Sequence, residues 1–312
     1  MGSTAQTIAH RVNDEVYQEN GRWYGTFKKG KYMFPIDEEE QDRLDFFHTM
    51  FLTVRNEELI SVSIHNQENP KVLDLGCGTG IWTIDMADKF PQGFHLGLDL
   101  SLIQPEYIPA NTRFMQRDIE VSWQNDLEPG SWDLIHIGMM HGSISNSNWP
   151  RVYAEVARHL RPYYGVIEQI EIDWVLKSDD GSFSPNSVTA KLLDELLDAM
   201  DGFDRPMRLD SALTKQRMAD AGLVDIKEEV VRLATNRWPA TDPNSDLDPE
   251  AGRWFNIGLT HGIAGLCMAP LTRGHNRTVF EIKEMADQVK EELRSRKVHG
   301  YANVHIYTAR KP

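Results

Sequence analysis

A glycine-rich turn is the feature of this sequence that most clearly suggests binding chemistry. Residues 72–82 read VLDLGCGTGIW, in which an apolar strand pattern passes into a helix through three glycines. Glycine lets the backbone approach a ligand without an intervening Cβ, and the first turn of the following helix offers unpaired N–H groups. Ligands of parallel sheets bind beyond the carboxyl ends of the strands, so we expect a cofactor at this turn.

The spacing of the glycines separates two classes of cofactor. A dinucleotide fingerprint, G-x-G-x-x-G, would need its third glycine at residue 81, which is isoleucine here. The third glycine is instead Gly80, which gives G-x-G-x-G shortly after Asp74. This pattern resembles motif I of the class I S-adenosylmethionine-dependent methyltransferases. The resemblance implies that Asp74 lies near the amino group of the cofactor and that the turn makes room for its methionine and ribose (Gly76, Cys77, Gly78 and Gly80).

The same resemblance gives roles to two acidic positions at the ends of later strands. Asp99, followed by Leu100, ends the second predicted strand and would accept both ribose hydroxyls. Asp118 follows the third predicted strand and would accept the adenine amino group, while the backbone N–H of Ile119 meets a ring nitrogen. The alternatives are a helix-capping Asp99 and a solvated Asp118. Three acidic positions in the expected order favour the cofactor roles.

Alternating strand and helix patterns must position these residues. Strand patterns occupy 71–76, 94–101, 112–119, 131–140 and 165–173, and helical patterns occupy 80–90 and 150–160. Such alternation predicts a parallel sheet covered by helices on both faces, in an α/β Rossmann-like fold. The resemblance implies the seven-stranded class I methyltransferase fold, with a final antiparallel strand at 303–310.

The chain divides into four predicted parts. These are an N-terminal lid segment and helix (1–66), an S-adenosylmethionine-binding core (67–234), a helical auxiliary insertion on the acceptor side (235–302) and the last core strand (303–312). The N-terminal helix is expected to start at Asp37 and to continue to about residue 62, because apolar residues recur there at helical spacing.

Two apolar stretches are candidates for a lid over the cofactor and for a pocket that holds the methyl acceptor. The aromatic N-terminal segment either covers the edge of the sheet or closes over the cofactor, with Tyr32 or Arg43 touching the methionine end. Residues 253–271 either form part of an acceptor pocket or pack as the core of the insertion.

Methyl transfer to oxygen or nitrogen can need a general base. His141 is the first candidate, because it follows the fourth predicted strand, where the methyl group should point. The alternative is a loop histidine that only shapes the pocket. Glu168 and Glu171, on the fifth strand, are weaker candidates, and one of them could be paired with the helices that cover the sheet.

Composition limits the kinds of partner that we expect for this chain. The chain has 33 Lys and Arg against 47 Asp and Glu, a net charge of −14, which disfavours direct binding to nucleic acid. Two cysteines cannot form a disulfide framework, and no histidine spacing indicates a metal site. Neither a secretory leader nor a membrane-spanning stretch is evident. We expect a cytoplasmic protein that could enter the nucleus through a partner.

Longer segments resemble one branch of the methyltransferases. Residues 20–48, 141–162 and 167–182 are similar to the LaeA-like fungal methyltransferases, whose founding member regulates secondary metabolism together with velvet-domain proteins. Our main expectation is O- or N-methylation of a small-molecule acceptor in secondary metabolism, with S-adenosylhomocysteine as the product. The alternatives are a LaeA-like regulator acting with a velvet-domain partner, and a protein methyltransferase.

Overall fold

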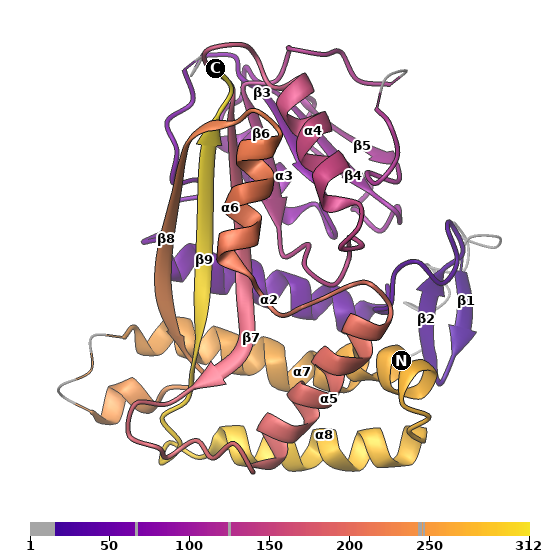
Figure 1. The fold of residues 1–312 in the computed structure, drawn as a ribbon, viewed down its shortest axis with the longest axis vertical. Coiled ribbons are helices and arrows are strands. Elements are labelled where there is room, and N and C mark those ends of the chain that lie inside the picture. The colour runs from indigo at the N-terminus through magenta and orange to yellow at the C-terminus, as the bar shows by residue number, and fades with distance from the viewer. Residues whose placement is uncertain (1–15, 66–67, 124–125, 243–244, 246) are drawn as a thin grey trace.

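A seven-stranded sheet forms the centre of the computed structural model, which describes residues 16–65, 68–123, 126–242, 245 and 247–312 (Figure 1). Its strands are β3 (Lys71–Leu75), β4 (Phe94–Asp99), β5 (Thr112–Gln116), β6 (Leu134–Gly138), β7 (Val166–Lys177), β8 (Val224–Ala234) and β9 (Tyr301–Arg310). Their order is β5-β4-β3-β6-β7-β9-β8. The first five strands are parallel, and β9 is antiparallel to both neighbours. The predicted α/β methyltransferase topology is confirmed.

Helices cover both faces of the parallel part of the sheet. They are α3 (Ile81–Lys89), α4 (Trp149–His159) and α6 (Ser211–Asp220). Successive strand residues point to opposite faces, so Val72 joins Trp82 of α3 in one buried cluster. Its neighbour Leu73 joins Val152 of α4 in another cluster. This double coverage explains why the strands read as continuous apolar runs.

The last three strands extend into a second, helical layer. β7, β9 and β8 have 12, 10 and 11 residues, against five in β3, and they run down into a group of helices below the sheet (Figure 1). These helices are α2 (Glu38–Val54), α5 (Val188–Gly202), α7 (Pro249–Gly274) and α8 (Val279–Arg294), with a short 3₁₀ turn η1 (Trp238–Thr241) before α7. Ile172 and Val304 of the strands share a buried core with Leu196 and Phe255 of the helices.

Helix α7 is the apolar segment that the sequence places at 253–271. Glycine normally weakens a helix, but here it allows close packing against α2. A Cβ at Gly258 would lie 2.5 Å from the Phe47 ring, and one at Gly262 would collide with the side chain of Arg43. The buried glycines therefore make room for bulky residues of α2.

The N-terminal segment forms a hairpin and a strap. β1 (Val16–Glu19) pairs with β2 (Arg22–Gly25). Residues 26–36, which we call the strap, then lead to α2. The carboxylate of Asp37 caps α2 and accepts two hydrogen bonds from the Arg22 guanidinium (2.7 and 2.5 Å). The hairpin is thereby held to the start of the helix.

The expected continuation of α2 to residue 62 is wrong. The helix ends at Val54, and Asn56 and Glu57 follow with φ of +53° and +66°. The apolar spacing beyond has another cause, since Leu59 is buried beside Trp82 and its carbonyl accepts the indole N–H at 3.0 Å. Packing against α3, not helix formation, places this residue.

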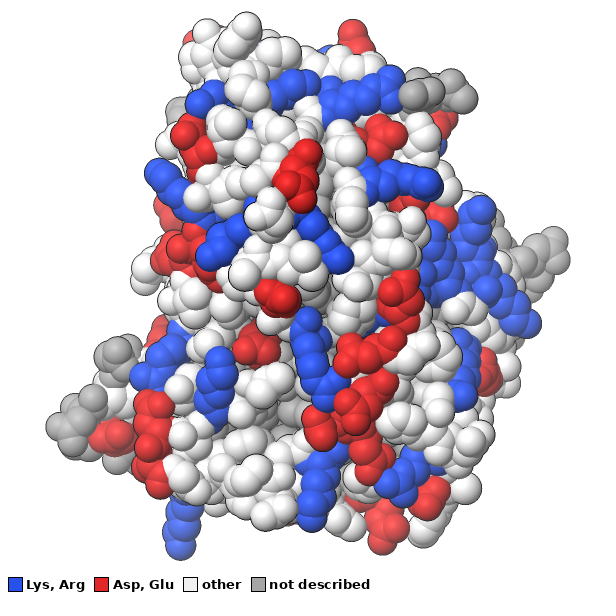
Figure 2. Space-filling model, in the orientation of Figure 1, with Lys and Arg blue, Asp and Glu red and all other residues white. Residues whose placement is uncertain are grey.

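Charges of both signs are interspersed over the face shown in Figure 2. Three acidic residues of α5 share one cationic partner. The guanidinium of Arg208 contacts Asp194, Asp198 and Asp201 at 2.6–2.7 Å. Among the described residues, no helix combines the length and apolar character needed to cross a membrane.

Candidate active site

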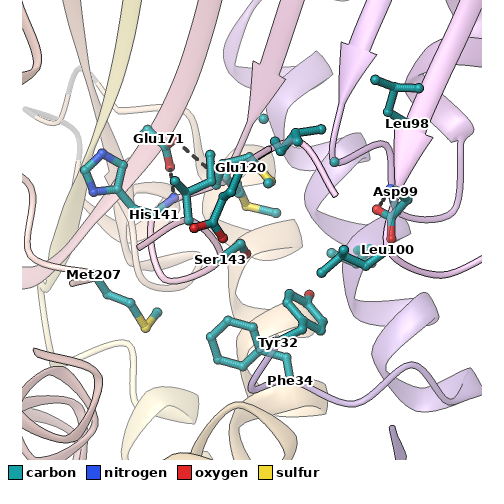
Figure 3. A pocket seen from close by; sticks show the side chains of 18 of the residues that line it. Tyr32, Phe34, Leu98, Asp99, Leu100, Glu120, His141, Ser143, Glu171 and Met207 are labelled. Carbon is teal, nitrogen blue, oxygen red and sulfur yellow. Dashed lines mark hydrogen bonds between the residues drawn. The ribbon is translucent and has the colours of Figure 1, made fainter. Parts of the chain in front are cut away.

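A cavity opens at the carboxyl ends of the parallel strands, beneath the N-terminal strap (Figure 3). It contains about 930 Å³ of empty space, part of it continuous with solvent. The residues proposed from sequence that line it are Tyr32, Arg43, Gly76, Gly78, Asp99, Leu100, Asp118, Ile119, His141 and Glu171. Four others, Asp74, Cys77, Gly80 and Glu168, lie outside the lining.

The glycine turn has the backbone conformation that its sequence requires. Gly76, Gly78 and Gly80 have φ of +74°, +54° and +81°, a region that other residues seldom adopt. The amide of Gly78 donates to Asp99 at 2.9 Å. A Cβ at Gly80 would lie 2.5 Å from the ring of Phe114, so the third glycine serves close packing at the start of α3.

Asp99 lies at the end of β4 and faces the cavity. Its carboxylate accepts from the amides of Gly78 and Ser101, each at 2.9 Å. Burial raises the pKa of Asp99 to about 6, against these hydrogen bonds. A partly desolvated carboxylate at this position can accept hydrogen bonds from hydroxyl groups. Its contact with the ribose stays a prediction.

Asp118 and its neighbour Glu120 form a polar wall that the strap closes. The ammonium of Lys31 contacts Asp118 at 2.5 Å and Glu120 at 3.2 Å. Glu120 also accepts from Ser145 (2.6 Å) and pairs with Arg205 (3.3 Å). Although burial acts in the opposite direction, these partners hold the pKa of Glu120 at about 2. Sequence reasoning missed Lys31 and Glu120, because neither belongs to the motif.

Asp74 lies behind the turn. It is 3% exposed, and its carboxylate accepts from Thr83 at 2.7 Å and contacts Nδ1 of His136 at 2.9 Å. Trp82 stacks on His136 at 3.7 Å between ring centroids. The two oxygens of Asp74 are thus bonded within the protein, outside the cavity lining, and its contact with the cofactor amino group stays a prediction. Cys77 is also buried, and burial raises its thiol pKa well above the usual range.

His141 lines the opposite end of the cavity. Its ring packs against Trp149 at 5.2 Å, and its buried Nδ1 has no hydrogen-bond partner among the described residues. Burial, assisted by the positive field of Arg217 and His305, lowers the pKa of His141 to about 4. The imidazole is therefore neutral near pH 7 and a weak base.

The two glutamates of β7 face opposite sides of the sheet. Glu168 accepts from Arg55 (2.8 Å) and from the amide of Ser61 (2.5 Å), away from the cavity. Glu171 faces the cavity and accepts from the amides of Met140 (3.1 Å) and His141 (3.2 Å). The expectation that one of them pairs with the covering elements fits Glu168.

Methionine sulfur surrounds the end of the cavity near His141. Met139, Met140 and Met207 line it, and a Cβ at Gly76 would collide with the sulfur of Met140. We call this part, with His141 and Glu171, the sulfur end, and the part lined by Gly78, Asp99, Leu100, Asp118 and Ile119 the turn end (Figure 3). The adjacent Met139 and Met140 after β6 were a usable sequence signal. Met207, on a distant loop, gave none.

The strap and α2 form the remaining wall. Tyr32 and Phe34 line the cavity and meet edge to face at 5.4 Å, while Trp23 and Phe27 stay exposed. Arg43 also lines it, with its guanidinium held by Glu40 at 2.6 and 2.9 Å. Of the 253–271 segment, Leu266 reaches the lining, and most of the others are buried.

These features fit S-adenosylmethionine. Gly76 and Gly78 line the cavity with backbone alone, and a Cβ at either would press on a lining side chain, Met140 or Leu44. The carboxylate of Asp99 lies at the turn end, beside the Gly78 amide. No group of three or more His, Cys, Asp or Glu that could hold a metal ion occurs in the described part of the chain.

Comparison with known proteins gives a consistent result. Residues 72–163 match the family model described as a methyltransferase domain. The chain is 44% identical over 300 residues to the secondary metabolism regulator LAE1 of Cochliobolus heterostrophus, covering 95% of each chain. It is 38% identical over 310 residues to the secondary metabolism regulator laeA of Fusarium oxysporum f. sp. lycopersici, covering 97% of this chain and 94% of that protein.

A third relative carries a more specific name. The protein-methionine methyltransferase laeA of Emericella nidulans is 37% identical over 315 residues, covering 100% of this chain and 81% of that protein. These similarities extend well beyond the turn and the sheet to nearly the whole sequence.

Proposed function

Because this chain belongs to the LaeA family of S-adenosylmethionine-dependent methyltransferases, we propose that it is a regulator of secondary metabolism that methylates methionine side chains of proteins. The chain is a methyltransferase whose cofactor is S-adenosylmethionine and whose product is S-adenosylhomocysteine. The relatives favour the regulatory alternative over our main expectation of small-molecule O- or N-methylation, since their names describe regulators.

The composition of the sulfur end carries the choice of acceptor. Three methionines line it, and thioethers adapt to irregular apolar partners, including other methionine side chains. The name of the Emericella nidulans relative supports the same acceptor class.

The low pKa of His141 also suits an acceptor without a proton. When bound, S-adenosylmethionine supplies a methyl group on a positive sulfur, and transfer to a thioether forms a new sulfonium without proton release. A base is needed only for acceptors that lose a proton. His141 is a weak base, and both oxygens of Glu171 already accept N–H bonds. The protein therefore has mainly to orient the acceptor.

The partner and location are part of the proposal. We propose that the chain acts with a velvet-domain protein and reaches the nucleus with it. The support is the resemblance of residues 20–48, 141–162 and 167–182 to the LaeA-like branch. Co-purification of the tagged chain with a velvet-domain protein, and its nuclear accumulation only when that protein is present, are the expected results. Nuclear entry without the partner would contradict this part.

The acceptor is tested with a matched pair of peptides. Purified chain is incubated with trideuteromethyl-labelled S-adenosylmethionine and either a methionine peptide or the same peptide with norleucine, and the products are analysed by mass spectrometry. We expect label on the methionine sulfur, as a fixed-charge sulfonium, and none on the norleucine peptide. Digestion of the enzyme from the same samples, followed by mass spectrometry, shows whether its own methionines also carry the label. Label on amine nitrogen or hydroxyl oxygen would contradict the proposal.

A further inference from the structure

The carboxylates that line the cavity differ in how their charge is balanced. Asp118 and Glu120 both contact the ammonium of Lys31, and Glu120 also pairs with Arg205. Those two negative charges therefore have positive partners within the protein. Any further cation in the cavity gains little from them, because their field is already neutralised over a short distance.

Glu171 lacks such a partner. Its side chain accepts from three N–H donors: the amides of Met140 (3.1 Å) and His141 (3.2 Å), and the side chain of Gln169 (2.9 Å). No cation among the described residues forms an ion pair with it. The residue is 1% exposed, and this burial raises the pKa of Glu171 to about 7. Dipoles alone thus hold a buried carboxylate at the wall of the cavity.

The position of Glu171 distinguishes it from Asp99. Figure 3 shows Glu171 beside His141 at one side of the cavity and Asp99 at the other. Asp99 lies at the turn end, at the close of β4. Glu171 lies at the sulfur end, where methionine side chains provide an apolar surrounding of low polarity. Electrostatic attraction is stronger in surroundings of low polarity than in water, so a cation at the sulfur end is stabilised most by Glu171.

The cofactor and its product differ by one methyl group and by the positive charge that this group gives the sulfur. S-adenosylmethionine carries a permanent sulfonium, and S-adenosylhomocysteine has a neutral thioether in its place. We propose that Glu171 is the counter-ion of that sulfonium and gives the site its preference for the cofactor over the spent product. The proposal depends on the cofactor and not on the identity of the methyl acceptor.

Other titratable groups face Glu171 from each element that packs around it. His141, after β6, is neutral because its pKa lies near 4, and burial keeps the pKa of Tyr153 on α4 well above its usual range. On β9, burial also raises the pKa of Tyr307, and His305, opposite Glu171 in the register, contacts Glu228 at 2.7 Å. On α6, Arg217 hydrogen-bonds Asn146 at 2.7 Å.

Across the cavity, two groups from the strap and α2 complete this environment. Tyr32 is half-buried, and desolvation raises its pKa, while Arg43 is bonded to Glu40. Asp99 has a pKa of about 6 and also changes charge in this range. Asp99 lies at the turn end, where cofactor and product are chemically identical. Its protonation therefore changes the two affinities equally and leaves their ratio unchanged.

The proton linkage has a definite sign. A sulfonium favours the ionised form of Glu171, so cofactor binding lowers the pKa of Glu171 and releases a proton near pH 7. Affinity for S-adenosylmethionine therefore rises with pH more than affinity for S-adenosylhomocysteine. Lowering the pKa by between one and two units corresponds to a change in preference of about five- to ninefold between pH 6 and pH 8.

Calorimetric titration of the whole chain tests the proposal. Both ligands are titrated at pH 6 and pH 8 into wild type, Glu171→Gln and Glu168→Gln. The last is a matched control, since Glu168 is a buried glutamate of the same strand on the opposite face. We expect the preference for S-adenosylmethionine to rise about five- to ninefold from pH 6 to pH 8 in wild type and Glu168→Gln, and to stay constant in Glu171→Gln.

A second readout needs no variant. Titrations at pH 7 in two buffers of different ionisation enthalpy count the protons released on binding. Release with S-adenosylmethionine that exceeds the release with S-adenosylhomocysteine is the expected result. Equal release for both ligands, or a wild-type preference that is the same at pH 6 and pH 8, would overturn the proposal. Because both experiments measure binding, they can fail while methionine methylation stands, and the reverse.

Discussion

The turn end and the sulfur end of one cavity are built on different principles. At the turn end, glycines at positive φ, short backbone contacts to Asp99 and the Lys31 ion pairs fix polar groups in place. At the sulfur end, flexible methionines surround a neutral histidine and a carboxylate without a cationic partner. The first arrangement suits rigid recognition of a nucleoside, and the second suits a variable acceptor beside a positive charge.

The pH dependence of stability would show the largest effect, at the sulfur end. A carboxyl whose pKa is about 7 when folded and about 4.5 when unfolded stabilises the fold fully below pH 4.5, and this contribution is lost as the pH rises to about 7. Relative to Glu171→Gln, the wild-type free energy of unfolding should fall by about 3 kcal/mol between pH 4.5 and pH 8. Urea denaturation measures it. Parallel profiles for the two proteins would show that Glu171 is not desolvated.

A pair of glycine substitutions tests the rigidity of the turn end. Gly80 and Gly30 share a φ of +81°, but only a Cβ at Gly80 would press on the Phe114 ring, since none of the described atoms lies within 4 Å of one at Gly30. Gly80→Ala should therefore lose about 2 kcal/mol more unfolding free energy than Gly30→Ala. It should also weaken cofactor binding, because the turn carries the Gly78 amide that donates to Asp99. Equal losses in the two variants would contradict close packing at this turn.

Removing the strap lysine should have a smaller effect, on the rate of cofactor release. Lys31→Met leaves Asp118 without its cationic partner and loosens the strap over the turn end. We expect release to become about tenfold faster, equivalent to about 1.4 kcal/mol. Stopped-flow displacement measures the rate. Lys28→Met is the control, since Lys28 is exposed on the same strap and its ammonium lies over the Phe27 ring. A fast rate in both variants would indicate a general charge effect.

The smallest effect is expected at His141. If the acceptor is a thioether, His141→Gln should change kcat by no more than about threefold, whereas loss of a true general base costs about 10²-fold or more. Steady-state kinetics with the methionine peptide decides between them. A loss of the larger size, in a folded variant, would restore His141 as the base and contradict a proton-free transfer.

Sequence predicted the turn end far better than the sulfur end, for a physical reason. The turn end is local: Asp99 and the glycines follow strands whose ends must meet in a parallel sheet. The sulfur end combines Met207, from a loop before α6, with Glu171 from β7 and Met139 after β6. No short-range pattern encodes that meeting, because it depends on the packing of distant segments.

Two details show where local patterns mislead. Helical spacing placed Leu59 in α2, but the chain turns at Asn56 and the side chain packs under α3 instead. Strand alternation predicts that Glu168 and Glu171 face opposite sides, yet it does not say which side holds the cavity. Tertiary structure decides this, since Glu168 pairs with Arg55 and Glu171 lines the cavity.

Calorimetric titration of S-adenosylmethionine into wild type and Asp99→Ala tests the central claim most directly. The account predicts one cofactor site per chain in wild type. It predicts an affinity at least about thirtyfold weaker in Asp99→Ala, because the variant loses the carboxylate at the turn end, about 2 kcal/mol of interaction. Circular dichroism confirms that the variant is folded. Unchanged affinity in a folded Asp99→Ala would place the cofactor elsewhere and contradict the assignment of both ends of the cavity.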